Sequence, residues 1–238
     1  MQESINDTKK ENNFSTRVEQ SGNNYLVAYL ILVLSLLLFW ATVSGITNGL
    51  SKKVDSILLS NLGYTNKWSK SFGPRWFIFV NDDISALAGP VLLPIFTLLI
   101  SGYVYLKRRF KVIRKFLFVA IGGAILMMIT KVFFATDLSN QSVDIIYNTI
   151  SPFPSGHAML GTIVYISLAV VISRTQRRPG VKKFLIASSI FLALLIGISR
   201  FITGGHTLTE VLAGWSLGMI WLTVCWLLED FKRKKGWL

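Results

Sequence analysis

Six stretches of apolar residues, separated by polar and charged segments, dominate the pattern along this chain of 238 residues. They cover residues 25–46, 84–106, 116–136, 158–173, 184–199 and 211–228. The first two run for more than 20 residues without a charge. A helix rises about 1.5 Å per residue, so stretches of this length cross an apolar bilayer core of about 30 Å. The pattern predicts an all-α polytopic membrane protein with six transmembrane helices in one bundle.

The fourth and fifth stretches have only 16 uncharged residues each and barely reach across the core. His157 immediately precedes the fourth stretch and Arg200 follows the fifth, so both are predicted at or just inside a membrane boundary. Pro90 and Pro94 fall within the second stretch and are expected to bend its helix, which a bundle tolerates.

Polar segments flank the membrane domain, which is assigned to residues 25–231. Residues 1–24 mix acidic and basic side chains without the order of a cleaved signal peptide, and a disordered tail is expected there. Residues 232–238 form a basic tail. Hydrophobic residues make up 52% of the chain, charged residues 16%, and mean hydropathy is +0.52, which also favours a membrane protein.

The basic residues gather in three clusters, within residues 107–115, 174–183 and 232–235. With six spans all three lie on one side, and the positive-inside rule makes that side cytoplasmic. The net charge of +13 is then mainly a topology signal, and no nucleic-acid partner is expected. The chain is predicted to be an inner-membrane protein with both termini cytoplasmic and both histidines extracytoplasmic.

The chain has only two histidines, and the first closes the sequence Pro154-Ser155-Gly156-His157. A helix start offers unpaired N–H groups and the positive end of the dipole to an anion, and glycine allows close approach. The alternative is that Pro154 and Ser155 only initiate a helix.

The second histidine follows an arginine in a motif that runs from Ser199 to Glu210. The guanidinium of Arg200 suits two phosphate oxygens, although an arginine reaching for headgroups gives the same pattern. Glu210 is placed to share a helix face with His206 and hold one ring nitrogen, leaving the other to attack. A capping box of Thr207 and Glu210 is the alternative, and the two can coexist.

Together with Lys131, which is otherwise a snorkelling lysine, these motifs resemble the phosphatidic acid phosphatase type 2 (PAP2) family. The family pattern is Lys-x6-Arg-Pro, Pro-Ser-Gly-His and Ser-Arg-x5-His-x3-Asp, and the resemblance covers residues 131 to about 228. It implies a six-helix membrane enzyme that removes phosphate from lipid phosphates or diphosphates without a metal or cofactor.

The resemblance also implies a role for each matching residue. His206 would be the nucleophile that forms a phosphohistidine, with Glu210 as its partner, and His157 the general acid. The phosphate would be bound by Lys131, Ser155, Gly156 and Arg200.

Two positions depart from the family pattern. Leu138 and Ser139 replace the arginine and proline of the first motif, so one phosphate-binding cation is missing, and Arg75 is a candidate substitute. Glu210 replaces the aspartate of the third motif, which keeps the charge but adds a methylene group.

The expected function is an integral membrane lipid phosphatase acting at the extracytoplasmic face on a polyprenyl diphosphate, a glycerophospholipid phosphate or a lipid A-like phosphate. A lipid-to-lipid phosphotransferase and a non-catalytic lipid-phosphate binding protein are the alternatives, the latter because of the missing arginine. Headgroup selectivity is expected from the first two spans and the loop 47–83, with its interfacial aromatic residues Trp68, Phe72, Trp76 and Phe77.

Cysteine labelling tests the predicted topology. In a Cys225→Ser background, a cysteine at Ser142 should react with an impermeant thiol reagent added outside intact cells, and a cysteine at Gln176 should not. Labelling at 176 but not at 142 would overturn the orientation and the proposed side of the site.

Overall fold

The computed structural model describes residues 2–61, 74–138 and 153–235, and all regular secondary structure in these ranges is helical. The helices are α1 (Gln2–Thr47), α2 (Leu50–Asn61), α3 (Arg75–Ala86), α4 (Leu92–Leu106), α5 (Phe110–Leu138), α6 (Gly156–Ser173), α7 (Pro179–Ile202) and α8 (Leu208–Lys234). Several residues named above lie outside the described ranges: Trp68, Phe72, Ser139 and Ser142.

Within the described ranges, five helices are long and apolar enough to cross a membrane. They are the segment Asn24–Ile46 of α1, the segment Phe110–Ala135 of α5, and the whole of α6, α7 and α8. The apolar helix α4 has only 15 residues, about 22 Å at 1.5 Å per residue. The described part of the chain is therefore all-helical, with helices that can span a membrane, while the predicted number of six is not confirmed.

The predicted second span, residues 84–106, is divided between two helices. α3 ends at Ala86, the chain turns through residues 87–91, and α4 begins at Leu92. Gly89 donates its N–H to the carbonyl of Ala86 at 2.8 Å, closing the turn. Pro90 has no N–H to continue a helical ladder and disfavours helical backbone in the residue before it. The expected bend is therefore a break.

α1 also differs from the sequence-based expectation at its polar end. The helix begins at Gln2, so the segment predicted as a disordered tail forms the start of the same helix that later becomes apolar. Residues 2–47 contain no proline, and extending an existing helix is easier than nucleating one.

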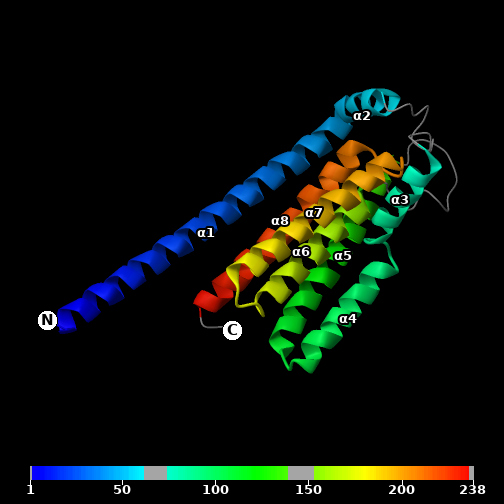
Figure 1. Ribbon diagram of the computed structural model, residues 1–238. Coiled ribbons are helices and arrows are strands. Elements are labelled where there is room, and N and C mark those ends of the chain that lie inside the picture. The colour runs from blue at the N-terminus through cyan, green and yellow to red at the C-terminus, as the bar shows by residue number, and fades with distance from the viewer. Residues whose placement is uncertain (1, 62–73, 139–152, 236–238) are drawn as a thin grey trace.

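α6 lies at the centre of the bundle (Figure 1). It packs against α5, α7 and α8 and more weakly against α4, while α1 lies along α8 and α3 packs against α7. Two clusters of buried side chains hold the bundle together: Ala88, Leu93, Phe116, Ala120, Val164 and Ile196 in one, and Met127, Met159, Ile163 and Leu217 in the other. Since α6 contributes to both, the position of its first turn is fixed by the core.

The outer surface of the bundle is apolar, as a lipid-facing surface must be. Leu34 of α1, Leu98 of α4 and Phe133 of α5 are each more than 60% exposed. At these positions the apolar side chains would contact lipid chains instead of other parts of the protein.

α8 lies close to the start of α6 at Gly214. A Cβ at this position would lie 2.6 Å from the backbone oxygen of Ser155 and 3.0 Å from the Cβ of Ala158. One turn earlier on α8, the carbonyl of Glu210 accepts the N–H of Ser155 at 3.0 Å. These contacts fix the two histidine-containing segments relative to each other.

Gly214→Ala is expected to lower the melting temperature of the protein in detergent. Alanine is intrinsically the better helix former by about 1 kcal/mol, but the added methyl group meets a backbone carbonyl that cannot rotate away, and overpacking costs about 1–3 kcal/mol. Gly102→Ala in α4 is the control, because nothing lies within 4 Å of a Cβ there. Equal shifts in the two variants would contradict the close approach.

Candidate active site

Ser155 stands at the N-cap of α6, but its hydroxyl does not cap the helix. The backbone is extended (φ −64°, ψ 112°), as at an N-cap, and no capping hydrogen bond is formed by the side chain. Ser155 is fully buried, and its Oγ has no hydrogen-bond partner among the described residues. A serine that only initiates a helix would use this hydroxyl. A buried, unpartnered hydroxyl at a helix N-terminus is instead suited to an anion.

Lys131 reaches the same helix start from α5. A Cβ at Gly156 would lie 3.5 Å from Cε of Lys131 and 2.9 Å from Sδ of Met127. The lysine side chain therefore passes beside the first turn of α6, and the absence of a side chain at Gly156 leaves room for it. His157, the next residue, is partly exposed in this same turn.

The turn between α7 and α8 brings Arg200 and His206 together. Gly204 has φ 68°, a left-handed conformation that glycine adopts without strain at the end of a helix. The chain then folds back, so that the N–H of His206 donates to the carbonyl of Arg200 at 3.1 Å. A Cβ at Gly205 would overlap the guanidinium of Arg200, which lies directly over the turn.

The guanidinium of Arg200 is anchored within the protein. Its Nη1 donates to Oγ of Ser85 on α3 at 3.1 Å, and its Nε is buried without a partner in the described part of the chain. A snorkelling arginine would extend its head group toward lipid headgroups, whereas this side chain is half-buried. The geometry favours the phosphate-binding interpretation over the anchoring one.

His206 and Glu210 form a close polar contact in the site. Nδ1 of His206 lies 2.7 Å from Oε2 of Glu210, and both side chains are buried. An ionised carboxylate only accepts hydrogen bonds, so Nδ1 carries the proton and Nε2 keeps its lone pair. His206 lies two residues before the first residue of α8, so the expectation that the pair shares a helix face is wrong.

The capping box is present as well. The same Oε2 of Glu210 accepts the N–H of Thr207 at 3.2 Å, and Oγ1 of Thr207 accepts the N–H of Glu210 at 3.4 Å. Both interpretations of Glu210 from the sequence, as partner of His206 and as part of a capping box, therefore apply at the same time. A glutamate at the third helical position reaches back far enough to bind both the N-cap and the histidine before it.

Burial lowers the pKa of His206 below its ordinary value. The hydrogen bond and charge of Glu210 oppose this shift, while the positive charges of Arg200 and Lys131 add to it. Both cations thus act on the same imidazole from different helices. The lowered pKa keeps His206 neutral at pH 7, which is the form that has a nucleophilic nitrogen.

Two residues that support the site, Asp55 and Ser85, belong to none of the sequence motifs and were not predicted from the sequence. Asp55 of α2 accepts the backbone N–H of Thr209 at 3.2 Å and also its hydroxyl, which adds a negative charge at the positive end of α8. Ser85 holds Arg200, as described above. In the sequence, Asp55 resembles any polar residue of a short amphipathic helix. Only the structure, in which its side chain is buried, distinguishes it from the exposed residues of that helix.

Arg75 does not take the place of the missing first-motif cation. It is the exposed first residue of α3, and ten residues separate it from Ser85, about 15 Å along the helix axis. Leu138, where the family has the arginine, is the last residue of α5. Among the described residues, the cations around the histidines are Lys131 and Arg200.

Comparison with known proteins finds a family match. The profile of the PAP2 superfamily matches residues 135–234, the segment that contains His157, Arg200, His206 and Glu210. Over these residues, which are less than half of the chain, the sequence is similar to the PAP2 superfamily. The resemblance deduced from the motifs is thereby confirmed, although the match begins after Lys131.

Curated relatives match over part of the chain. Phosphatidylglycerophosphatase B of Bacillus subtilis is 35% identical over 83 residues, 34% of this chain and 39% of that protein. A PA-phosphatase related-family protein of Dictyostelium discoideum is 31% identical over 105 residues, 42% of this chain and 31% of that protein. The matched segment thus spans about a third of the length of each relative.

A solved structure shares the fold over most of the chain. The crystal structure of a transmembrane PAP2 type phosphatidylglycerolphosphate phosphatase from Bacillus subtilis superposes with a TM-score of 0.63 at 20% identity. The alignment covers 85% of this chain and 96% of that one. At this identity the likeness concerns the fold, and it shows that the chain has the PAP2 membrane architecture.

Glu210→Gln is expected to disturb the tautomer of His206. Oε2 of Glu210 makes both contacts, so an amide NH2 group at its position would donate to Nδ1 of His206, favour the wrong tautomer and lose the bond from Thr207, and phosphatase activity should fall by roughly 10²–10⁴-fold. Glu210→Asp, which restores the family residue and keeps the charge, should retain more activity. Glu210 raises the pKa of His206, in opposition to the effect of burial. In Glu210→Gln this pKa should therefore be lower, and the decline of the remaining activity on the acid side of the pH profile should shift to lower pH than in the wild type. Wild-type kcat/KM in Glu210→Gln would mean that Glu210 only caps the helix.

Proposed function

We propose that the protein is an integral membrane lipid phosphatase. The observation that carries the proposal is the pairing of Nδ1 of His206 with Glu210 at 2.7 Å, which leaves Nε2 available as a nucleophile. The unpartnered Oγ of Ser155 and Nε of Arg200 support a phosphate site beside it. Relatives that are named phosphatases support the same reaction class.

In the proposed reaction, Nε2 of His206 attacks the phosphorus and the bond from phosphorus to the lipid oxygen breaks. His157 donates a proton to the departing oxygen, and a phosphohistidine is left on His206. His157 then takes a proton from a water molecule that attacks the phosphohistidine, which releases inorganic phosphate and restores both histidines.

Positive charge around the transferring phosphoryl group supplies most of the proposed rate enhancement. Lys131, Arg200 and the N-terminus of α6 are the sources of that charge. Because these groups belong to the protein itself, the proposed mechanism uses no metal ion.

The proposed substrate is a lipid monophosphate or diphosphate, and a glycerophospholipid phosphate is favoured by the name of the Bacillus relative. The alternatives are a polyprenyl diphosphate or a lipid A-like phosphate. A phosphotransferase would result if a lipid hydroxyl displaced the attacking water. A non-catalytic binding protein is the alternative that the missing first-motif arginine favours.

We further propose that residues 84–106, the end of α3 together with α4, form the sixth crossing and that the histidines face away from the cytoplasm. α4 packs along α5, and the start of α1 and the end of α8 point to the same end of the bundle (Figure 1). The basic residues cluster at that end, which the positive-inside rule places in the cytoplasm.

The experiment is a phosphate-release assay on purified protein with a panel of lipid phosphates, in the presence of a chelator. His206→Ala should abolish turnover, whereas His157→Ala should slow it severely yet still accumulate phosphoenzyme from a substrate with a good leaving group. Brief incubation with labelled substrate should leave acid-labile phosphate on the wild type. Appreciable turnover by His206→Ala would refute the mechanism, and mass analysis of the lipid products separates hydrolysis from transfer.

Truncation of the two remaining cations should be costly. Lys131→Ala and Arg200→Ala are each expected to lower kcat/KM by about a hundredfold or more, since losing one partner of a charge-assisted contact costs a few kcal/mol and each decade is about 1.4 kcal/mol. Leu138→Arg, which restores the first-motif cation, should be neutral or should lower KM. A silent Lys131→Ala beside an inactive Arg200→Ala would make Lys131 a snorkelling lysine.

A further inference from the structure

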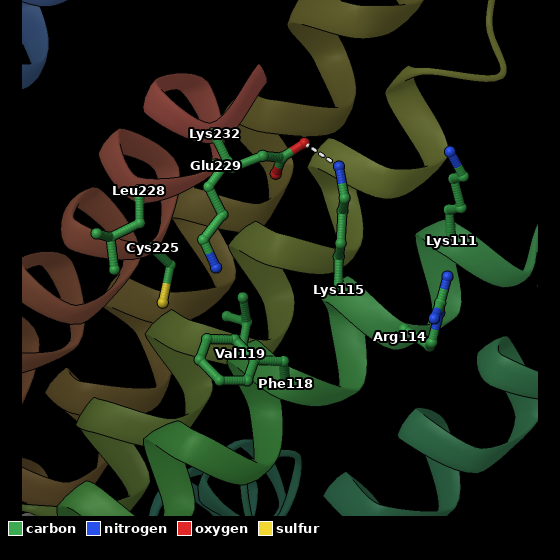
Figure 2. Close-up of a pocket in the computed structure, with 9 residues that line it drawn as sticks. All are labelled: Lys111, Arg114, Lys115, Phe118, Val119, Cys225, Leu228, Glu229 and Lys232. Atoms are coloured by element: carbon green, nitrogen blue, oxygen red, sulfur yellow. Dashed lines mark hydrogen bonds and ion pairs between the residues drawn. The ribbon is translucent and has the colours of Figure 1, made fainter. Parts of the chain in front are cut away.

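A cavity at the other end of the bundle is separate from the candidate active site. It has a volume of about 560 Å³ and opens between the first turns of α5 and the last turns of α8. Figure 2 shows the residues that line it: Lys111, Arg114, Lys115, Phe118, Val119, Cys225, Leu228, Glu229 and Lys232. Lys232 lies 26 residues after His206, nearly the full length of α8, or about 39 Å at 1.5 Å per residue.

An ion-pair network forms the polar wall of this cavity. Oε1 of Glu229 lies 2.7 Å from Nζ of Lys115 and 3.4 Å from Nη1 of Arg174, so one carboxylate joins α5, α6 and α8. The cavity-lining cations without an ion pair in the described ranges are Lys111, Arg114 and Lys232. The cavity therefore carries a surplus of positive charge at its polar end.

The remaining wall is apolar and faces the membrane. Phe118 is 60% exposed and Leu228 is 52% exposed, and both lie on membrane-spanning helices. In Figure 2 the side chain of Lys232 extends from α8 toward α5, above Phe118 and Val119. A second cavity of about 530 Å³ shares the Lys115–Glu229 pair with the first and is lined by further residues of α1 and α6. Both cavities are lined mainly by apolar surface, with this ion pair between them.

We propose that this cavity binds one anionic phospholipid of the surrounding leaflet. Its phosphodiester would lie among Lys111, Arg114 and Lys232, and an acyl chain would lie along Phe118 and Leu228. Basic pockets between transmembrane helices suit anionic headgroups. A soluble anion would leave the apolar wall unfilled, and a zwitterionic lipid carries no net negative charge to offset the positive charge of the three cations.

Membrane orientation alone does not account for the cavity. Basic residues that only set topology need no cavity between them, and Arg177, Arg178 and Lys182 lie in the same basic end without lining either cavity. Here residues more than 100 positions apart in sequence converge on one space. The bound lipid would bridge α5 and α8, the helices that carry Lys131 and Glu210 nearer their other ends, and would stabilise the bundle by mass action.

Cys225, the only cysteine, lines both cavities and serves as a reporter. In neutral detergent micelles, phosphatidylglycerol should slow its alkylation by N-ethylmaleimide several-fold, and phosphatidylcholine should not. Phosphatidylglycerol carries a phosphodiester and no terminal phosphate, so the outcome is independent of the proposed phosphatase activity. Native mass spectrometry should show one retained phosphatidylglycerol per chain.

The triple variant Lys111→Gln, Arg114→Gln, Lys232→Gln should lose both the protection and the retained lipid. The control Arg177→Gln, Arg178→Gln, Lys182→Gln removes the same charge from the same end of the bundle and should keep both. Equal protection by phosphatidylcholine, equal protection by glycerol phosphate without acyl chains, or unchanged lipid retention in the cavity triple would each overturn the proposal. If the thiol of Cys225 does not react even without lipid, the test is the amount of phosphatidylglycerol that native mass spectrometry finds on the cavity triple variant and on the control triple variant.

Discussion

The arrangement of the site depends on one junction, where the N–H of Ser155 donates to the carbonyl of Glu210 and α8 packs against the start of α6 at Gly214. α6 packs against helices on several sides, so the position of its first turn is fixed by the core. The contacts at the junction therefore also fix the start of α8 and the turn before it. His157 and His206, 49 positions apart in sequence, are thereby held at the same end of the bundle.

Glu210 shows how a single side chain serves local and tertiary structure at once. One oxygen caps the N-terminus of α8 and also binds Nδ1 of His206. The cap restrains the carboxylate, and the restrained carboxylate sets the tautomer of a histidine that lies outside the helix. Asp55 reinforces the same helix end from α2. Helix stability and the chemistry proposed for His206 are therefore coupled through the first turn of α8.

Positive charge is distributed between the two ends of the bundle with different consequences. At the histidine end, Lys131 and Arg200 are confined by neighbouring groups and lower the pKa of His206. At the opposite end the cations are numerous and largely exposed, and only some of them surround a cavity. At the histidine end, desolvation strengthens the electrostatic interactions of the few charges. At the opposite end, the exposed positive charges suit the anionic surface of a bilayer.

The sequence by itself determined the helical membrane architecture and the residues of the candidate site, because long apolar stretches allow only helices in lipid and because the family motifs are local patterns. It did not reveal that His206 lies before its helix, that residues 84–106 are broken at Pro90, or that Asp55 and Ser85 support the site. It also gave no sign of the cavity between α5 and α8. The first two features are local, but the support from Asp55 and Ser85 and the cavity arise from contacts between segments far apart in the chain. Periodicity and spacing do not encode such contacts, which only the packing of the whole bundle decides.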